Sequence, residues 1–356
     1  MTANGITRRG LLRNAGVIVS SAGIASASTG ASTNEQTGIV KSVQSFDNPV
    51  TSEQIHYNRN KALRKFIEFG GNRPEGYGYG HPPENSKDVI AHVVMYDADK
   101  GFREFIGRGA SSRDDTHVRQ SAAQFRDKIA GTQRVTSLES SGNTSSSGDE
   151  EWRTLSDSRW LYEKDPCGKV EVPYKWRKVD NDGSSSYDIF GLRTDVRFIP
   201  GYIAYDSAYR NDYHAIRHLE RDNGFRYIGD YSPEGITFGS SSVTTNLGWN
   251  TASWSWSYTT PDVSIEQNGD TTVGELDWDV PNNDGDTISG NARNSTLTWE
   301  PGSRWRWDQQ SCKGEVGYLR NDIYCEFNQD GSFAYGDCNF NEHHDFWYTA
   351  GHPNLC

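Results

Sequence analysis

The sequence predicts an α+β protein in which a small N-terminal helix-hairpin-helix unit precedes a larger, all-β, sandwich-like domain. Three observations support this prediction. Helical spacing of apolar residues is concentrated before residue 135, a Ser/Gly-rich stretch follows, and short strand-like runs separated by turn residues fill the second half. Many short strands with turns between them are typical of β-sandwiches and barrels.

The N-terminal unit is predicted over residues 47–135. The capping-box pattern TSEQ at 51–54 opens a helix, because a hydroxyl at the N-cap and a Glu or Gln three positions later satisfy free backbone N–H groups. Residues 89–96 and 102–106 are apolar runs around a polar turn, which indicates a hairpin. Residues 114–130 carry apolar side chains at helical spacing. The expected order is therefore helix, strand, strand, helix.

The β-rich domain is predicted over residues 151–356. Residues 136–150 are rich in Ser, Gly and Thr, which is typical of a flexible linker, and we place the domain boundary there. Asp-Gly and Asn-Gly dipeptides, which favour hairpin turns, recur through the strand-like runs that follow. Residues 213–221 are the one stretch of this half that is compatible with a helix.

The N-terminus carries the pattern of an export signal. Arg8 and Arg9 precede a short, weakly apolar run that ends in small residues near Ala27. This order resembles the twin-arginine signal peptides, which implies recognition by the twin-arginine export machinery, removal of residues 1–27 and secretion to the extracellular space. Residues 28–46 are small and polar and predict a disordered leader. No cysteine precedes residue 167, so we expect no lipid-linked membrane anchor.

The composition is acidic. There are 48 acidic and 36 basic residues, a net charge of −12, and this field disfavours binding to nucleic acid or to an anionic membrane. Together with the export signal, the acidic, Ser- and Thr-rich composition resembles secreted proteins of salt-loving archaea. An ordinary acidic secreted protein is the alternative.

The five cysteines are unevenly placed. Cys312, Cys325, Cys338 and Cys356 crowd the C-terminus, and in an oxidising compartment they predict two disulfides with three alternative pairings. Cys167 stands apart. It is a buried thiol, an intermolecular bridge, or the partner of a tail cysteine.

Aromatic residues alternate with polar ones in two predicted strands. In 252–258 the serines project opposite the rings, and in 304–308 the arginines do, so each strand has an aromatic face. Exposed rings in a row bind sugar rings or protein partners, whereas the same face turned inward is sandwich core, which is the commoner outcome. The candidate binding residues are Trp254, Trp256, Tyr258, Trp305 and Trp307.

Two groups of carboxylates are further candidates. Glu275, Asp277 and Asp279 share one strand face, and paired carboxylates perform glycoside hydrolysis, although a solvated face explains them more simply. Two Asp-rich loops offer oxygen ligands of the kind that calcium takes, although hairpin turns again explain them more simply. Calcium is the one cofactor that the sequence suggests, with ligands drawn from Asp180, Asp182, Asp188, Asp284 and Asp286.

The sequence lacks H-E-x-x-H, G-x-S-x-G, C-x-x-C and a glycine-rich phosphate loop, which favours a non-enzymatic role. The leading hypothesis is an extracellular interaction protein whose disulfide-stapled β-domain binds a glycan or a protein. The N-terminal unit is then an accessory domain or a prosegment severed in the linker. The alternatives are a secreted hydrolase acting on glycans through Glu275, Asp277 or Asp279, and a halocin-like antagonistic toxin with a cleavable prosegment.

Overall fold

The computed structural model describes residues 38–74, 76–81, 88–139, 151–180, 187–221, 225–236, 242–272, 274–280, 290–308, 315–329 and 338–350. All of them lie in the compact unit Asn34–Cys356. The predicted signal residues Arg8 and Arg9 fall outside this description. Among the described residues, no helix has the length and apolar character needed to cross a membrane.

The described elements follow one another in chain order. The helices are α1 (Ser52–Glu68), α2 (Asp115–Glu139), α3 (Gly201–Ala204) and α4 (Gly290–Arg293). The strands are β1 (Val40–Val43), β2 (Gly76–His81), β3 (Val89–Asp97), β4 (Gly101–Gly109), β5 (Glu151–Lys164), β6 (Gly168–Asp180), β7 (Tyr187–Thr194), β8 (Val196–Pro200), β9 (Tyr209–Glu220), β10 (Phe225–Ser232), β11 (Ser242–Trp249), β12 (Ala252–Thr259), β13 (Glu266–Gln267), β14 (Glu275–Val280), β15 (Leu297–Trp299), β16 (Gly302–Asp308), β17 (Glu315–Gln329) and β18 (Asn339–Ala350).

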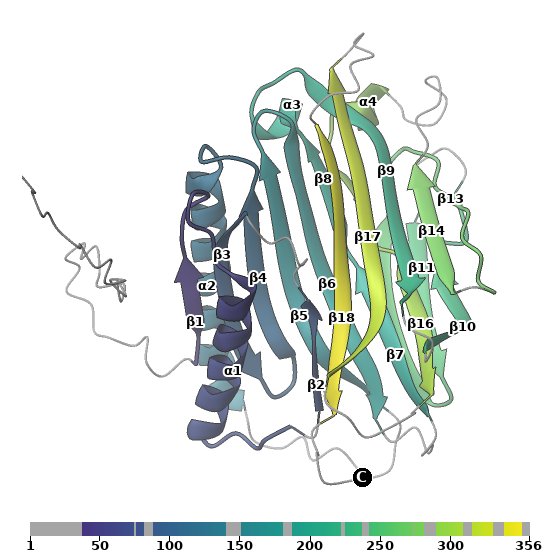
Figure 1. Ribbon diagram of the computed structural model, residues 1–356. Coiled ribbons are helices and arrows are strands. Elements are labelled where there is room, and N and C mark those ends of the chain that lie inside the picture. The colour runs from purple at the N-terminus through teal and green to yellow at the C-terminus, as the bar shows by residue number, and fades with distance from the viewer. Residues whose placement is uncertain are drawn as a thin grey trace, which may run out of the picture. The chain divides into compact units, whose positions relative to one another are not determined.

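Two sheets organise these strands, which confirms the predicted β-rich architecture (Figure 1). The large sheet has the order β1-β3-β4-β5-β6-β7-β16-β10, with β8 and β15 attached to β6. The small sheet has the order β13-β14-β9-β17-β18-β2, and β11 pairs with β12 in a separate hairpin. The prediction that residues 213–221 are compatible with a helix was wrong. Residues 213–220 lie in β9, where His214, Ile216 and His218 point into the core and alternate with Tyr213 and Arg217.

The main core lies between the two sheets and is dominated by aromatic rings. Trp176 of β6 stacks on Phe190 of β7 with ring centroids 5.1 Å apart, and Phe346 of β18 contacts Trp176 at 5.6 Å. These three side chains are wholly buried. Because burying a ring of this kind stabilises the fold by ~1.5–3 kcal/mol, the interlocked rings hold the sheets together.

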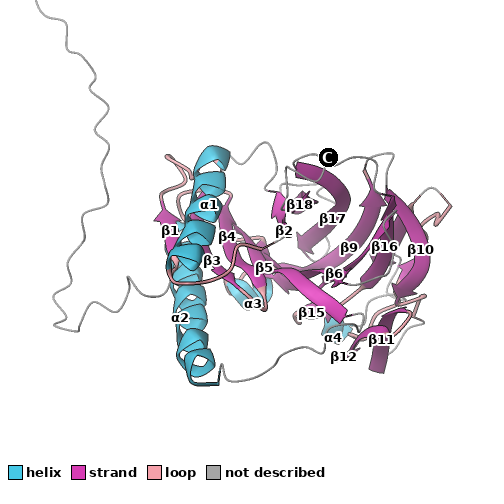
Figure 2. Ribbon diagram, turned by 90° about the horizontal axis from the view of Figure 1, so that it is seen from below, coloured by secondary structure: helices cyan, strands magenta, loops and turns pink. Residues whose placement is uncertain are grey.

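The helices α1 and α2 cover opposite faces of the β3–β4 hairpin (Figure 2). β3 is therefore buried on both faces, which explains its nearly continuous apolar sequence. As predicted from the capping pattern, the Thr51 hydroxyl accepts a hydrogen bond from the Gln54 backbone N–H at 3.3 Å and starts α1. Inside this layer, the buried Arg59 of α1 pairs with Glu104 of β4 at 2.7 Å.

The large sheet continues across the sequence position where we predicted a domain boundary. β4 lies parallel to β5, with Phe102 opposite Ser156 and Gly109 opposite Glu163. Gly101 makes this approach feasible, since its φ is +60° and a Cβ there would lie 2.0 Å from the Leu155 carbonyl oxygen. The β3–β4 hairpin of the N-terminal part thus belongs to the same sheet as β5 and the strands that follow it, and α1 and α2 pack on this hairpin.

Candidate functional site

The aromatic face of β12 is buried, so of the two interpretations of these residues the core is confirmed and the exposed binding surface is wrong. Trp254, Trp256 and Tyr258 are between 5% and 8% exposed, while the serines between them face outward. Arg177 and Arg193 of the large sheet place their guanidinium groups 4.3 and 4.9 Å from the Trp254 and Trp256 rings. Cations stacked on ring faces add to the packing and leave no open stacking surface for a sugar.

The second aromatic pair, Trp305 and Trp307 of β16, also packs against the core. Trp305 is fully buried and donates its indole N–H to the Ser303 hydroxyl at 2.6 Å. Trp307 is half-buried and packs against the same core. The β11–β12 hairpin packs closely on β16, because a Cβ on Gly302 of β16 would lie 2.3 Å from the Trp256 ring. Alternation identified the two faces correctly, but only the three-dimensional arrangement shows which face is covered.

The carboxylates of β14 lie on the face of the small sheet that points away from the core. Asp277 forms an ion pair with Arg217 at 2.7 Å, and burial and the neighbouring Asp279 raise its pKa to about 6. Asp279 accepts a hydrogen bond from the Tyr213 hydroxyl at 2.6 Å, and Glu275 is half-buried. The pairing register places Arg217 between Asp277 and Asp322 of β17, so a second carboxylate is present on this face.

The two candidate calcium ligands that the structure describes are paired with basic side chains. Asp180 pairs with Arg153 at 2.8 Å, and Asp188 pairs with Lys178 at 2.7 Å. Asp182, Asp284 and Asp286 lie outside the described residues. Among the residues that are described, no group of three or more His, Cys, Asp or Glu side chains is arranged to hold a metal ion.

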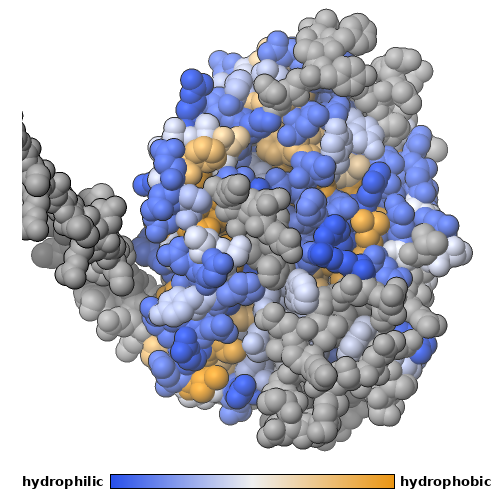
Figure 3. Space-filling model, viewed as in Figure 1, coloured by the Kyte–Doolittle hydropathy of each residue, from blue (hydrophilic) through white to orange (hydrophobic). Residues whose placement is uncertain are grey.

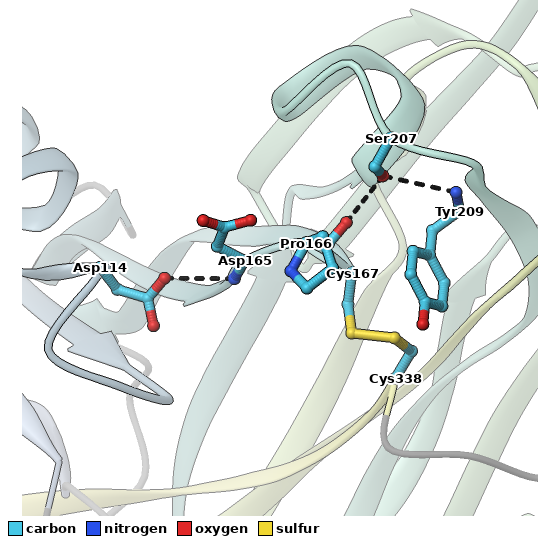
Figure 4. The surroundings of a disulfide bond; sticks show 7 residues. All are labelled: Asp114, Asp165, Pro166, Cys167, Ser207, Tyr209 and Cys338. Atoms are coloured by element: carbon cyan, nitrogen blue, oxygen red, sulfur yellow. Dashed lines mark hydrogen bonds between the residues drawn. A yellow bond between two sulfur atoms is a disulfide. The ribbon is translucent and has the colours of Figure 1, made fainter.

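The disulfide joins Cys167 to Cys338, across 171 positions of the chain (Figure 4). This corrects the prediction that the four tail cysteines pair among themselves and selects the alternative in which Cys167 takes a tail partner. Cys325 is a free, buried thiol, because its strand pairing turns the side chain into the core. Cys312 and Cys356 lie outside the described residues.

Hydrogen bonds fix the loop that carries Cys167. The buried Asp114 accepts from the Asp165 backbone N–H at 3.1 Å through Oδ1 and from the Ala110 backbone N–H at 2.8 Å through Oδ2. On the other side, the Ser207 hydroxyl donates to the Pro166 carbonyl at 2.8 Å (Figure 4). Because Asp114 directly precedes α2, it ties the start of that helix to the disulfide loop.

A pocket of about 260 Å³ opens next to this disulfide. Its walls come from the end of β4, the end of β5 and the start of β18, together with the residue before β3. Two walls are thus the segments that the disulfide joins, since β5 ends just before Cys167 and β18 begins just after Cys338. The lining residues are Asp88, Arg108, Gly109, Ala110, Tyr162, Glu163, Lys164, Asn339, Phe340, Asn341 and Glu342.

Arg108 is the central charge of the pocket. It makes a two-pronged ion pair with Asp88, with N–O distances of 2.7 and 2.8 Å, and its remaining terminal nitrogen donates to Glu342. The guanidinium group also lies 4.9 Å from the centre of the Tyr162 ring. Burial alone would lower the pKa of Arg108, but the two carboxylates outweigh it, so the side chain stays charged. The Arg108–Glu342 contact crosses from the large sheet to the small one.

Glu342 is a carboxyl group of the pocket whose pKa lies near neutral pH. Burial raises its pKa to about 7 despite the opposing effect of Arg108, and the nearby Asp88 adds to the rise. A carboxyl group with a pKa in this range exchanges its proton near neutral pH, which is typical of functional sites. Glu163, on the opposite wall, is also buried and pairs with Lys169 at 2.5 Å.

Behind the pocket wall, Tyr162 is hydrogen bonded to His344 through the phenolic oxygen and Nε2. His344 is fully buried, and its ring centre lies 3.9 Å from that of Trp160. Burial lowers the pKa of His344 and raises that of Tyr162, so both are neutral at physiological pH. The pair supports the wall as a neutral hydrogen bond and adds no charge.

No protein-family model matches this chain. No curated protein is similar to it in sequence either. Among solved structures, the NetB toxin of Clostridium perfringens in its membrane-inserted form aligns with a TM-score of 0.25 and 9% identity, over 50% of this chain and 89% of that one. A likeness of this degree carries no weight for fold or function.

Sequence reasoning missed the pocket because its residues come from four separate segments between positions 88 and 342. None of these segments contains a local motif. One signal was available in β4, whose residues are all buried even though Arg103, Glu104 and Arg108 interrupt the apolar run. Charged side chains inside a strand buried on both faces need partners from other strands. Such a pattern identifies a buried polar site without locating its other members.

Proposed function

We propose that the protein is an extracellular binding protein whose pocket beside the Cys167–Cys338 disulfide takes one sugar unit of a glycan. The observation that carries this proposal is the pocket itself, in which Asp88, Arg108 and Glu342 form a continuous donor and acceptor network next to aromatic residues.

The charge balance favours a neutral, hydroxyl-rich ligand. Arg108 is already paired with two carboxylates, so an anion would have to displace Asp88 or Glu342 from it. A cationic ligand would compete with Arg108 and Lys169 for the same carboxylates. A sugar hydroxyl both donates and accepts, so it can bond to a carboxylate and a guanidinium group at once without disturbing either charge.

The size and the apolar wall favour a single ring. The volume of about 260 Å³ is below the ~300–1,000 Å³ of sites for drug-sized ligands. Phe340 supplies an apolar part of the lining, which suits the C–H face of a sugar. The disulfide supports binding, because it holds two of the walls at a fixed separation.

The hydrolase alternative has one supporting observation, the raised pKa of Asp277 with Asp322 on the same sheet face. We favour binding over hydrolysis because Arg217 lies between these two carboxylates and because the pocket next to the disulfide does not include them.

We also propose secretion through the twin-arginine route in a salt-rich environment. The Arg8-Arg9 pair, the acidic composition and a disulfide, which is typical of oxidising compartments, support this. We further propose that the helix-hairpin-helix segment within residues 47–135 is a lobe accessory to the sandwich. Replacing both arginines by lysine is expected to retain the protein inside the cell, and undiminished secretion of that variant would contradict the export proposal.

The binding proposal is tested by calorimetric titration of the full chain with a panel of free monosaccharides. We expect one of them to bind saturably, and Glu342→Gln to weaken binding ~10–100-fold, because a hydrogen bond to a charged group contributes ~1.5–3 kcal/mol. Asp277→Asn is the matched control, since it removes another buried, Arg-paired carboxylate and should leave the affinity unchanged. Absence of binding across the panel, or equal effects of both variants, would overturn the proposal.

A further inference from the structure

One surface of the molecule combines exposed apolar side chains with cations that form no ion pair, and it lies on the outer face and at the C-terminal end of α1. Of the six exposed large hydrophobic residues among those described, three lie here, namely Tyr57, Ile67 and Phe69. Tyr57 on α1 and Phe69 at its C-cap are each 55% exposed, which is unusual for aromatic rings. Figure 3 shows apolar side chains breaking the polar surface over α1.

The charges of this surface oppose those of the whole chain. The α1 strip, as we call it, comprises the three hydrophobic residues above and four cations, against which stand only Glu53 and Glu68 on α1. The strip therefore carries about two positive charges in a chain of net charge −12. Within the described residues none of these cations forms a salt bridge. The cations are Lys61, Arg64, Lys65 and Arg73.

The two sides of α1 are chemically distinct. Ile55, Ala62 and Leu63 are buried against β1 and β3, and Asn58 donates to Ser42 of β1 at 2.9 Å. The helix is therefore held in the fold by its inner face, and the strip is its outer face with the residues that directly follow it. A surface fixed in this way can lie on a flat partner but cannot insert as a separate helix.

We propose that the α1 strip is a contact surface for an anionic lipid bilayer. Interfacial helices use the same combination, with rings and aliphatic side chains reaching the headgroup boundary and Lys and Arg contacting lipid phosphates. A soluble polyanion would explain the cations but not the three exposed apolar side chains. Charge complementarity and apolar exposure together therefore favour a bilayer.

The acidity of the rest of the molecule does not prevent this contact. Electrostatic screening reduces the range of the net negative charge to about 8 Å at physiological ionic strength and about 3 Å at 1 M salt. At these distances the bilayer responds to the residues that touch it.

The test is flotation of the full chain with vesicles of phosphatidylcholine containing phosphatidylglycerol, compared with vesicles of phosphatidylcholine alone. We expect binding to the anionic vesicles only. Each cation removed, as in Lys61→Gln or Arg64→Gln, should lower partitioning about fivefold. The double variant Tyr57→Gln/Phe69→Gln should lower it at least tenfold.

Tyr202→Gln/Ile203→Gln is the matched control, because these are two exposed large hydrophobic residues that lie outside the strip, on α3. It should bind like the unaltered chain, and thermal unfolding midpoints should agree across all variants. Equal binding to neutral vesicles, or equal loss in the control, overturns the proposal. Binding to a soluble polyanion such as heparin that depends on the cations but not on Tyr57 and Phe69 overturns it as well.

Discussion

Replacing Glu342 by Gln tests the electrostatics of the pocket directly. Burial raises the pKa of this carboxyl group to about 7 from its ordinary value of 4.5, so the folded protein binds the proton more tightly than the unfolded chain does. Its contribution to stability is therefore complete below pH 4.5 and is lost as the pH rises through about 7. Gln is nearly the same shape and stays neutral, so it removes this dependence.

The magnitude follows from the two pKa values. The side chain is only 17% exposed, so solvent screening reduces the effect little. The difference in unfolding free energy between the unaltered chain and Glu342→Gln should fall by ~2.5 kcal/mol between pH 5 and pH 8. A change of this size is a substantial part of the ~5–15 kcal/mol that stabilises a typical domain.

The assay is urea denaturation of both proteins at several pH values across this range, with the two free energies subtracted at each pH. Subtraction cancels the other titrating groups, including His214 and His218, whose pKa values burial lowers to about 3. Asp277→Asn provides a second curve that should fall with a midpoint nearer pH 6. A flat difference curve for Glu342→Gln, or one that rises with pH, refutes the reasoning.

Three further substitutions should destabilise the fold by amounts that denaturation midpoints can measure. Cys338→Ser opens the long disulfide loop and should cost ~2–5 kcal/mol under oxidising conditions, with no difference from the unaltered chain once both are reduced. Glu104→Gln leaves the buried Arg59 without its anion and should cost ~3–5 kcal/mol. Trp256→Ala removes a buried ring and should cost ~3–5 kcal/mol, whereas Ser255→Ala on the exposed face should change stability by less than ~0.5 kcal/mol.

Periodicity and capping made part of the fold predictable from sequence. The Thr51 cap, the hairpin around residues 97–101 and the two faces of β12 all follow from local rules, and the structure contains each of them. These features depend on neighbours a few positions away, so the sequence alone is sufficient to specify them.

Long-range choices were beyond local rules. Whether the Trp254 face turns inward depends on Gly191 and Gly302, which leave room for the rings from strands far away in the chain. Cys338 finds Cys167 because β18 begins where β5 ends, and no spacing pattern encodes that. The pocket has the same origin, since Arg108 and Glu342 meet only once the two sheets pack.

The pairing of β2 with β18 also determines when, during synthesis, the small sheet can be completed. β2 lies near the start of the described fold, and its backbone partners are Asp345–Ala350 at the far end. Roughly 270 residues must be made between the two, which takes roughly 15–55 s at ~5–20 residues per second on the ribosome. Until then β2 has no partner strand, and the small sheet that covers the core is incomplete. A machinery that exports only folded chains would therefore have nothing to accept before the last strand has been synthesised.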